Sequence, residues 1–246
     1  MTQPFFCTIV AALAALLFIS SRALAQENAP RFEIGGQFSL LQRNNPSTQF
    51  DDFIPAPNVA EPGFGARFTC NVRNDFALEA EANILPGRYK AEGSFSPSPF
   101  ENTNVPSGHI YQGQFGVKTG KRFEKVGLFI KARPGFVGFT RASHLTGLTP
   151  ITIIHPFIGP LQFEKPEFRI GKVTYLSMDV GGVVEFYPSR RIVTRLDIGD
   201  TIIRYGIYRE PGIVVCATIC PPPVVLERPA ETRHNLQFSA GVGIRF

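Results

Sequence analysis

The chain has 246 residues, of which 43% are hydrophobic and 18% are charged, and its formal net charge is +5 at pH 7. A mean hydropathy of +0.03 excludes a helical membrane protein. The 23 glycines and 23 phenylalanines favour turns and strands, so the composition predicts a β architecture. Basic and acidic residues alternate instead of clustering, which argues against a nucleic-acid partner despite the basic balance.

The N-terminus carries a candidate export signal. Residues 9–19 are apolar, and the small-residue pattern Ala23-Leu24-Ala25 follows before Gln26. An apolar run of this length is too short to span a bilayer, which needs roughly twenty residues. We therefore predict a signal peptide over residues 1–25, cut after Ala25, and one domain over residues 26–246.

Eight later segments alternate apolar and polar residues with the period of two that is typical of strands. In residues 31–42, for example, Phe32, Ile34 and Phe38 share one face, while Glu33 and Gln37 share the other. The eight predicted strands cover residues 31–42, 63–73, 76–84, 109–119, 126–136, 172–186, 191–208 and 234–246.

The connections between these segments alternate in length. Those after the second, fourth and sixth segments are short, whereas residues 43–62, 86–108, 137–171 and 209–233 form long connections. Short turns on one rim and long loops on the other are the pattern of transmembrane β-barrels. An even strand number would place both ends of the barrel at the short-turn side, which is predicted to be the periplasm, and no second domain is expected.

The last predicted strand carries the most specific signal. Leu236, Phe238, Val242, Ile244 and Phe246 lie on one face of residues 234–246. This strand resembles the closing strand of bacterial outer-membrane barrels, whose final Phe is read by the barrel-assembly machinery. On that resemblance Phe238, Val242, Ile244 and Phe246 are the candidate assembly signal.

Over essentially the whole mature chain, the sequence resembles the small OmpA/OmpX/OmpW-like group of outer-membrane barrels. The resemblance implies an all-β fold, an eight-stranded antiparallel up-and-down barrel in the bacterial outer membrane. It also implies a monomeric, non-enzymatic protein with an envelope-structural or surface-binding role. Its expected partners are outer-membrane lipid and, in transit, the barrel-assembly machinery and periplasmic chaperones. Two alternatives stay open: a narrow channel for small or hydrophobic solutes, and a lipid-modifying enzyme.

Alternation alone does not say which strand face is inside, because a soluble lipocalin-like barrel turns its apolar face inward. Glycines decide the prediction, since Gly35, Gly65, Gly181, Gly241 and Gly243 lie among the charged residues of the polar face. Glycine on a solvated strand face weakens the strand and offers no compensating contact. In a narrow lumen it leaves room for large side chains. The polar face is therefore predicted to line the lumen.

Twelve charged residues fall on this polar face, and we expect them to form a lumen charge network. Six are basic and six acidic, a balance that suits an ion-paired plug better than an ion-selective conduit. They are Glu33, Arg67, Arg73, Glu79, Glu81, Lys131, Arg133, Asp179, Glu185, Arg195, Asp197 and Arg245.

No catalytic, metal or cofactor site is predicted. The four histidines, at 109, 144, 155 and 234, are dispersed, and none has the serine two residues later that a lipid A deacylase of this strand number would require. A nucleophile elbow and a phosphate-binding loop are also missing from the sequence.

Two apolar connections and the cysteines complete the sequence-based predictions. Cys216 and Cys220 lie in an exported loop and are expected to form a disulfide, while Cys70 is expected on an apolar strand face. Residues 149–163 and 211–226 are too hydrophobic for freely solvated loops. They are expected either to pack together or extend the strands, or to form an apolar binding patch on the outer rim.

Overall fold

The computed structural model describes residues 30–44, 59–87, 108–155, 159–211 and 225–246. Eight antiparallel strands close into a barrel in the order β1-β10-β7-β6-β5-β4-β3-β2. Their bounds are β1 (Phe32–Arg43), β2 (Val59–Arg73), β3 (Phe76–Pro86), β4 (His109–Arg122), β5 (Val126–His155), β6 (Gly159–Phe186), β7 (Ile192–Tyr205) and β10 (Glu231–Arg245). No helix in the described ranges is long and apolar enough to cross a membrane.

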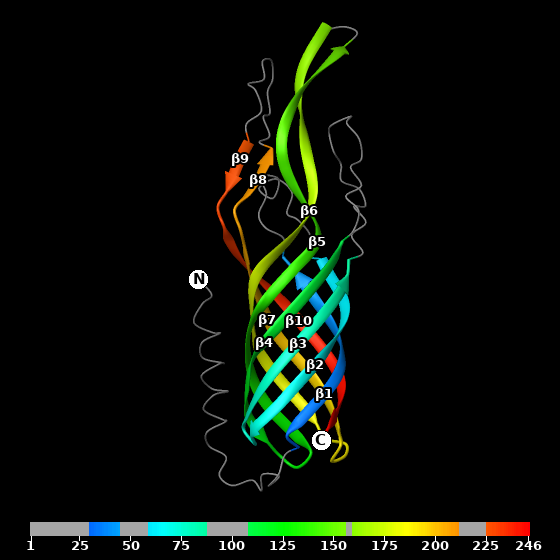
Figure 1. Cartoon of the computed structure of the whole chain (residues 1–246), viewed down its shortest axis with the longest axis vertical. Coiled ribbons are helices and arrows are strands. Elements are labelled where there is room, and N and C mark those ends of the chain that lie inside the picture. The colour runs from blue at the N-terminus through cyan, green and yellow to red at the C-terminus, as the bar shows by residue number, and fades with distance from the viewer. Residues whose placement is uncertain (1–29, 45–58, 88–107, 156–158, 212–224) are drawn as a thin grey trace, which may run out of the picture.

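The predicted eight-stranded antiparallel barrel is confirmed, but two of the predicted loops are wrong. Residues 137–171 were expected to be a loop, yet β5 and β6 continue through most of them as one paired hairpin. This hairpin projects far beyond the barrel in Figure 1. Within the expected loop 209–233, β8 (Tyr208–Pro211) pairs with β9 (Val225–Arg228) in a separate two-stranded sheet.

The expectation that residues 149–163 extend the strands is therefore confirmed for the backbone, where Ile151 pairs with Phe163 and Ile153 with Leu161. Each arm of the hairpin supplies the backbone partners of the other, so an apolar sequence need not remain a loop. The connection between β8 and β9, including most of the apolar segment 211–226, lies outside the described residues.

Three short turns lie at one end of the barrel, together with the start of β1 and the end of β10 (Figure 1). They join β2 to β3, β4 to β5 and β6 to β7, and we call this end the short-turn rim. The barrel closes there through two backbone hydrogen bonds of 2.9 Å between Phe32 and Phe246, each residue donating to the carbonyl of the other.

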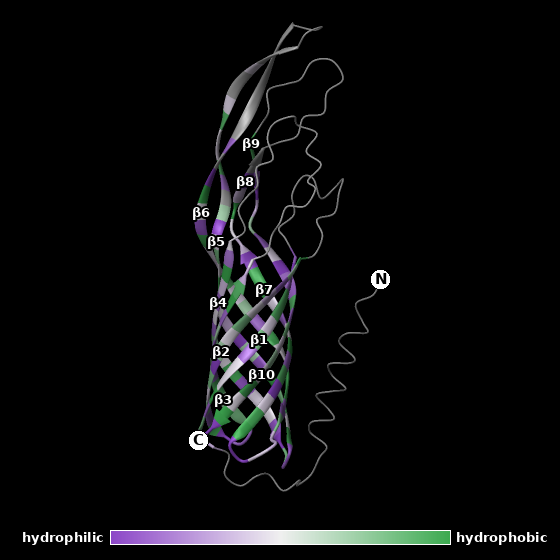
Figure 2. Cartoon of the chain, turned by 90° about the vertical axis from the view of Figure 1, so that its right-hand side faces the viewer, coloured by the Kyte–Doolittle hydropathy of each residue, from purple (hydrophilic) through white to green (hydrophobic). Residues whose placement is uncertain are grey.

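The two faces of the barrel wall have opposite chemistry. Along β1 the side chains of Ile34 and Phe38 are 55% and 56% exposed, whereas Glu33 and Gln37 are buried. The same alternation runs along the other barrel strands, and Figure 2 shows it as polar and apolar residues following one another on the wall. Large apolar side chains therefore cover the outside, and polar side chains fill the inside.

Glycines allow the inner face to pack closely. A Cβ added to Gly181, which faces inward on β6, would lie 2.5 Å from Cα of Gly199 on β7, closer than real Cβ contacts. The next residue, Gly182, faces outward and has no atom within 4 Å of the same added Cβ. The inward glycines thus mark places where adjacent backbone leaves no space for a side chain.

Candidate functional site: the barrel lumen

The lumen contains a dense set of buried charges. Among the described residues, seven acidic and seven basic side chains are buried. They are Glu33, Glu61, Glu79, Glu81, Asp179, Glu185 and Asp197, and Arg67, Lys118, Arg122, Lys131, Arg133, Arg195 and Arg245. Because a buried charge is costly unless it is paired, the arrangement of these groups decides whether the barrel is stable.

Two arginines form the centre of the network. Arg133 contacts Asp179 and Glu81, each at 2.5 Å, and reaches Glu79 at 3.5 Å. Arg195 contacts Asp197 through Nε at 2.6 Å and binds both oxygens of Glu79. Arg195 binds Glu79 and Asp197 in the bidentate geometry that favours Arg over Lys in buried ion pairs, whereas Nε and Nη2 of Arg133 share the single oxygen Oδ2 of Asp179.

Two lysines connect carboxylates that these arginines already bind. Lys131 lies 2.8 Å from Asp179 and 3.2 Å from Asp197. Lys118 contacts Glu185 and lies 3.3 Å from Glu79. Glu79 therefore faces Lys118, Arg133 and Arg195 at once, so the charges form one continuous network.

At the short-turn rim the network ends in aromatic and charged contacts. Arg122 donates to the Tyr187 hydroxyl at 2.9 Å, and that hydroxyl donates to Glu185 at 2.8 Å. Burial, followed by the neighbouring Glu185 carboxylate, raises the pKa of Tyr187, which lies in the turn beyond β6. The protonated phenol can therefore donate. Arg245 lies over the Tyr187 ring, 4.4 Å from its centroid, and donates to Glu33 at 3.2 Å.

A layer of neutral amides borders the charges on the other side. Asn83 donates to Glu81 at 2.7 Å and to Gln112 at 3.0 Å, and Gln112 donates to Gln237 at 3.0 Å. Thr201 completes the chain by donating to Gln237 at 2.7 Å. These bonds tie β3, β4, β7 and β10 together across the lumen without adding charge.

An apolar cluster lies beyond the amides. On three strands, a member of this cluster stands two residues closer to the long connections than a member of the amide layer. The pairs are Leu85 and Asn83, Ile110 and Gln112, and Ile203 and Thr201. The buried members of the cluster are Leu41, Leu85, Ile110, Val137, Ile203 and Tyr205. Tyr175 packs edge-on against Tyr205, with ring centroids 4.9 Å apart. This cluster, which we call the apolar plug, fills the lumen near the extended hairpin.

Eleven of the twelve charged residues predicted for the lumen are buried within it, and Arg73 is the exception. Arg73 is the last residue of β2, where the turn leaves its side chain exposed. Sequence reasoning missed Lys118 and Arg122, although both stand in phase with Gln112 and Gln114, opposite Tyr111 and Phe115. Ending the fourth predicted strand at residue 119 removed Arg122 from consideration.

The candidate assembly residues Phe238, Val242, Ile244 and Phe246 all lie exposed on the outer face of the barrel. Cys70 is a free cysteine on the same face of β2 as Phe68, which agrees with its predicted placement. The predicted Cys216–Cys220 disulfide and the predicted signal peptide, residues 1–25, lie outside the described residues.

One histidine has a carboxylate partner on the outer wall. His234 Nδ1 lies 2.5 Å from Asp200 Oδ2, and the imidazole is 69% exposed. In the part of the chain that the structure describes, no three His, Cys, Asp or Glu side chains are placed to hold a metal ion.

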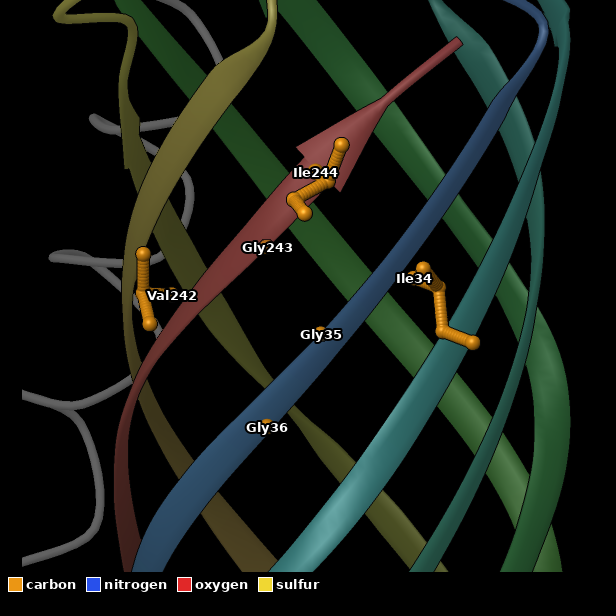
Figure 3. A pocket seen from close by; sticks show the side chains of 6 residues that line it. All are labelled: Ile34, Gly35, Gly36, Val242, Gly243 and Ile244. Atoms are coloured by element: carbon orange, nitrogen blue, oxygen red, sulfur yellow. The ribbon is translucent and has the colours of Figure 1, made fainter.

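A shallow apolar pocket lies on the outer face, where β1 meets β10. Figure 3 shows Ile34, Val242 and Ile244 around it, with Gly35, Gly36 and Gly243 along the two strands. Its lining has no titratable side chain, so it offers surface for apolar contact and no catalytic chemistry.

No family model and no curated protein matches the sequence. Solved structures do match. One is the N-terminal β-barrel domain of OprF from Pseudomonas aeruginosa, with 10% identity, a TM-score of 0.39, and coverage of 89% of this chain and 98% of that chain. A second is Ail, the attachment invasion locus protein of Yersinia pestis, with 11% identity, a TM-score of 0.42, and coverage of 89% and 100%.

A third is Neisserial surface protein A, with 16% identity, a TM-score of 0.42, and coverage of 87% of this chain and 97% of that chain. The closed strand order and the buried charge network establish the architecture. In fold, the chain is a small eight-stranded antiparallel β-barrel with its charges inside and its large apolar side chains outside.

Proposed function

We propose that this protein is a non-enzymatic outer-membrane barrel that spans the bilayer with a sealed lumen and carries a structural or surface-binding role in the cell envelope. The single observation that supports this most is the inverted burial. Charged side chains such as Arg133 and Glu79 are fully buried, while Phe64, Phe115 and Ile244 are 60–61% exposed on the outside.

Contact with lipid explains that inversion. Exposed apolar surface in water costs about 25 cal/mol per Å² relative to burial, so a wall of large apolar side chains is unfavourable in a soluble protein. In a bilayer the same wall faces hydrocarbon, and the closed ladder leaves no unpaired strand edge there. The soluble lipocalin-like alternative requires an apolar interior, yet most of the buried side chains in the described residues are polar or charged.

The sealed lumen supports a structural role over the channel alternative. The buried acidic and basic residues balance in number, and the apolar plug separates all of them except Glu61 from the end of the barrel that carries the hairpin. A conducting pore would need a continuous wet path, which ion-paired side chains and packed aromatic rings obstruct.

The extended hairpin supports a surface role. Because β5 and β6 continue beyond the barrel, the hairpin would stand outside the cell if the long connections face outward and the short-turn rim faces the periplasm. In this proposal the barrel is a monomer surrounded by outer-membrane lipid. Periplasmic chaperones and the barrel-assembly machinery handle it only in transit.

Reconstitution of the purified chain tests the proposal. Refolded into phosphatidylcholine vesicles, it should give mainly β circular dichroism, heat-modifiable migration and no stable ion conductance in planar bilayers. Protease added to intact cells should cut within residues 143–169 and leave the barrel strands protected. Reproducible single-channel conductance would favour the channel alternative, and recovery as a soluble protein without detergent would exclude membrane insertion.

A further inference from the structure

The short-turn rim carries an unusual excess of positive charge. Six cationic residues that are exposed or half-buried stand in or beside its three turns and just before β1, against two such acidic residues, Asp75 and Glu124. The six are Arg31, Arg73, Lys121, Lys125, Arg190 and Arg191, and all but Lys121 are exposed.

Backbone hydrogen bonds hold the segments that carry these cations side by side around the rim. The amide of Asn71 donates to the carbonyl of Arg31 at 2.8 Å. The amide of Arg245 donates to the carbonyl of Arg191 at 2.9 Å. Gly120 donates to Asp75, and Tyr187 donates to Lys125, both at 2.9 Å. The cations are therefore mounted on one ordered ring, which lowers the entropy cost of binding a partner.

These cations lie directly at the edge of the apolar outer wall. Arg73 follows Val72, which is 55% exposed, and Arg191 precedes Ile192, which is 43% exposed. One residue along a strand advances only about 3.3 Å. If the wall contacts hydrocarbon, the cationic ring stands at the depth of the lipid headgroups.

At the opposite end of the barrel some cations have carboxylate partners, while others, such as Lys172 and Arg204, have none among the described residues. There Arg233 pairs with Glu231 at 3.0 Å, Arg43 with Glu61 at 3.4 Å and Arg209 with Glu227 at 2.7 Å. Within the described ranges, the side chains of Arg73, Lys125, Arg190 and Arg191 have no such carboxylate partner. Their charge is available to an anion.

We propose that the short-turn rim binds the phosphate groups of anionic phospholipids, such as phosphatidylglycerol, in the leaflet that it faces. This inference rests on the proposed membrane insertion. Guanidinium forks bind phosphate oxygens in a bidentate manner, and each Lys or Arg near an anionic membrane surface adds a favourable electrostatic contribution. The ring would select anionic over zwitterionic lipid, and salt would weaken that selection.

The test compares two variants of equal charge. The rim variant carries Arg73→Gln, Lys125→Gln, Arg190→Gln and Arg191→Gln. The control carries Arg141→Gln, Arg169→Gln, Lys172→Gln and Arg204→Gln, four exposed cations on strands β5, β6 and β7, outside the short-turn rim. Each purified barrel is refolded in detergent, and bound phosphatidylglycerol is titrated by native mass spectrometry, with phosphatidylcholine and inorganic phosphate as comparisons.

The rim variant should bind phosphatidylglycerol at least about tenfold more weakly, while the control keeps the affinity of the original chain. Phosphatidylcholine binding should be equal in all three. Equal loss in both variants, or unchanged binding in the rim variant, would overturn the proposal. So would displacement by inorganic phosphate at the same concentration as the lipid, because the site would then be one for free phosphate.

Circular dichroism and heat-modifiability of the same samples in phosphatidylcholine vesicles separate this inference from the proposed function. A barrel that inserts but shows no preference for phosphatidylglycerol contradicts only the lipid site. A chain that does not insert contradicts both.

Discussion

At the scale of single residues, Arg133 shows how the lumen tolerates charge. Its guanidinium is fully buried and faces carboxylates from two strands, Glu81 on β3 and Asp179 on β6. Removing it leaves the buried Glu81 carboxylate without a cationic partner, while Asp179 keeps only Lys131. The loss of stability on removing Arg133 therefore comes mainly from the carboxylate left buried without a cation, more than from the lost arginine itself.

We expect Arg133→Leu to lower the free energy of unfolding in urea by about 3–5 kcal/mol. Adding Glu81→Gln to that variant should restore part of the loss, because one stranded charge is removed. Arg209→Leu is the matched control: its ion pair with Glu227 has side chains 63% and 59% exposed, and pairs of this kind contribute about 1 kcal/mol or less. Equal stabilities for the two single variants would mean that water enters the lumen freely.

At the scale of the strands, two adjacent glycines of β6 lie in opposite environments. Gly181 faces the packed interior, where the backbone of Ile198 and Gly199 occupies the space of a side chain. Gly182 faces outward, where that space is open.

Gly181→Ala should lower the free energy of unfolding by about 1–3 kcal/mol, since β6 and β7 must separate to admit the methyl group. Gly182→Ala should leave the free energy of unfolding unchanged or raise it by up to about 1 kcal/mol. Alanine loses less conformational entropy than glycine when the chain folds. Urea titration of both variants in the same detergent checks the contrast. The reverse order of stabilities would show that the two faces of β6 are assigned wrongly.

The hairpin formed by the ends of β5 and β6 should be separable from the barrel. Within the barrel wall β5 also pairs with β4, through residues as far as Phe139, whereas the ladder beyond Ala142 joins β5 only to β6. Replacing residues 143–169 with a short turn should therefore keep β circular dichroism, heat-modifiability and the urea midpoint close to those of the full chain. A large drop in the midpoint would show that the hairpin supports the barrel.

At the scale of the whole molecule, closure depends on the pairing of β1 with β10. Their register runs from Glu33 opposite Arg245 to Gln42 opposite Leu236, and Phe246 adds a ring 6.1 Å from that of Phe32. Strand β10 therefore completes the sheet against β1, and its outward residues are the candidate assembly signal.

Phe246→Asp should leave export intact but reduce the amount of folded barrel in the outer membrane severalfold, because a carboxylate replaces an exposed aromatic at the edge of the apolar wall. Phe246→Tyr, which keeps the aromatic ring, should assemble normally. Heat-modifiable protein in purified outer membranes is the measurement. Normal levels of the Asp variant would contradict the proposed role of this residue in assembly.

The sequence by itself determined which residues share a strand face, and the glycines on the polar face indicated that this face lines the lumen. The period of two is a local property of extended backbone, so Glu33, Arg67 and Arg195 could be assigned to one face without knowing their partners. The alternation of short and long connections likewise determined the rim at which the turns gather. Arg73 and Arg122 were misplaced because strand ends are set by where pairing stops.

Only the tertiary structure decided which charges pair and where the sheet ends. Arg195 and Glu79 lie 116 residues apart, and they meet because closure of the barrel brings β7 across from β3. The extension of β5 and β6 into residues 137–171 was equally undetermined, because an apolar segment becomes a strand only when another segment satisfies its backbone. The charge pairs depend on register between strands that are distant in sequence, and the hairpin depends on the pairing of two consecutive strands; period-two alternation encodes neither.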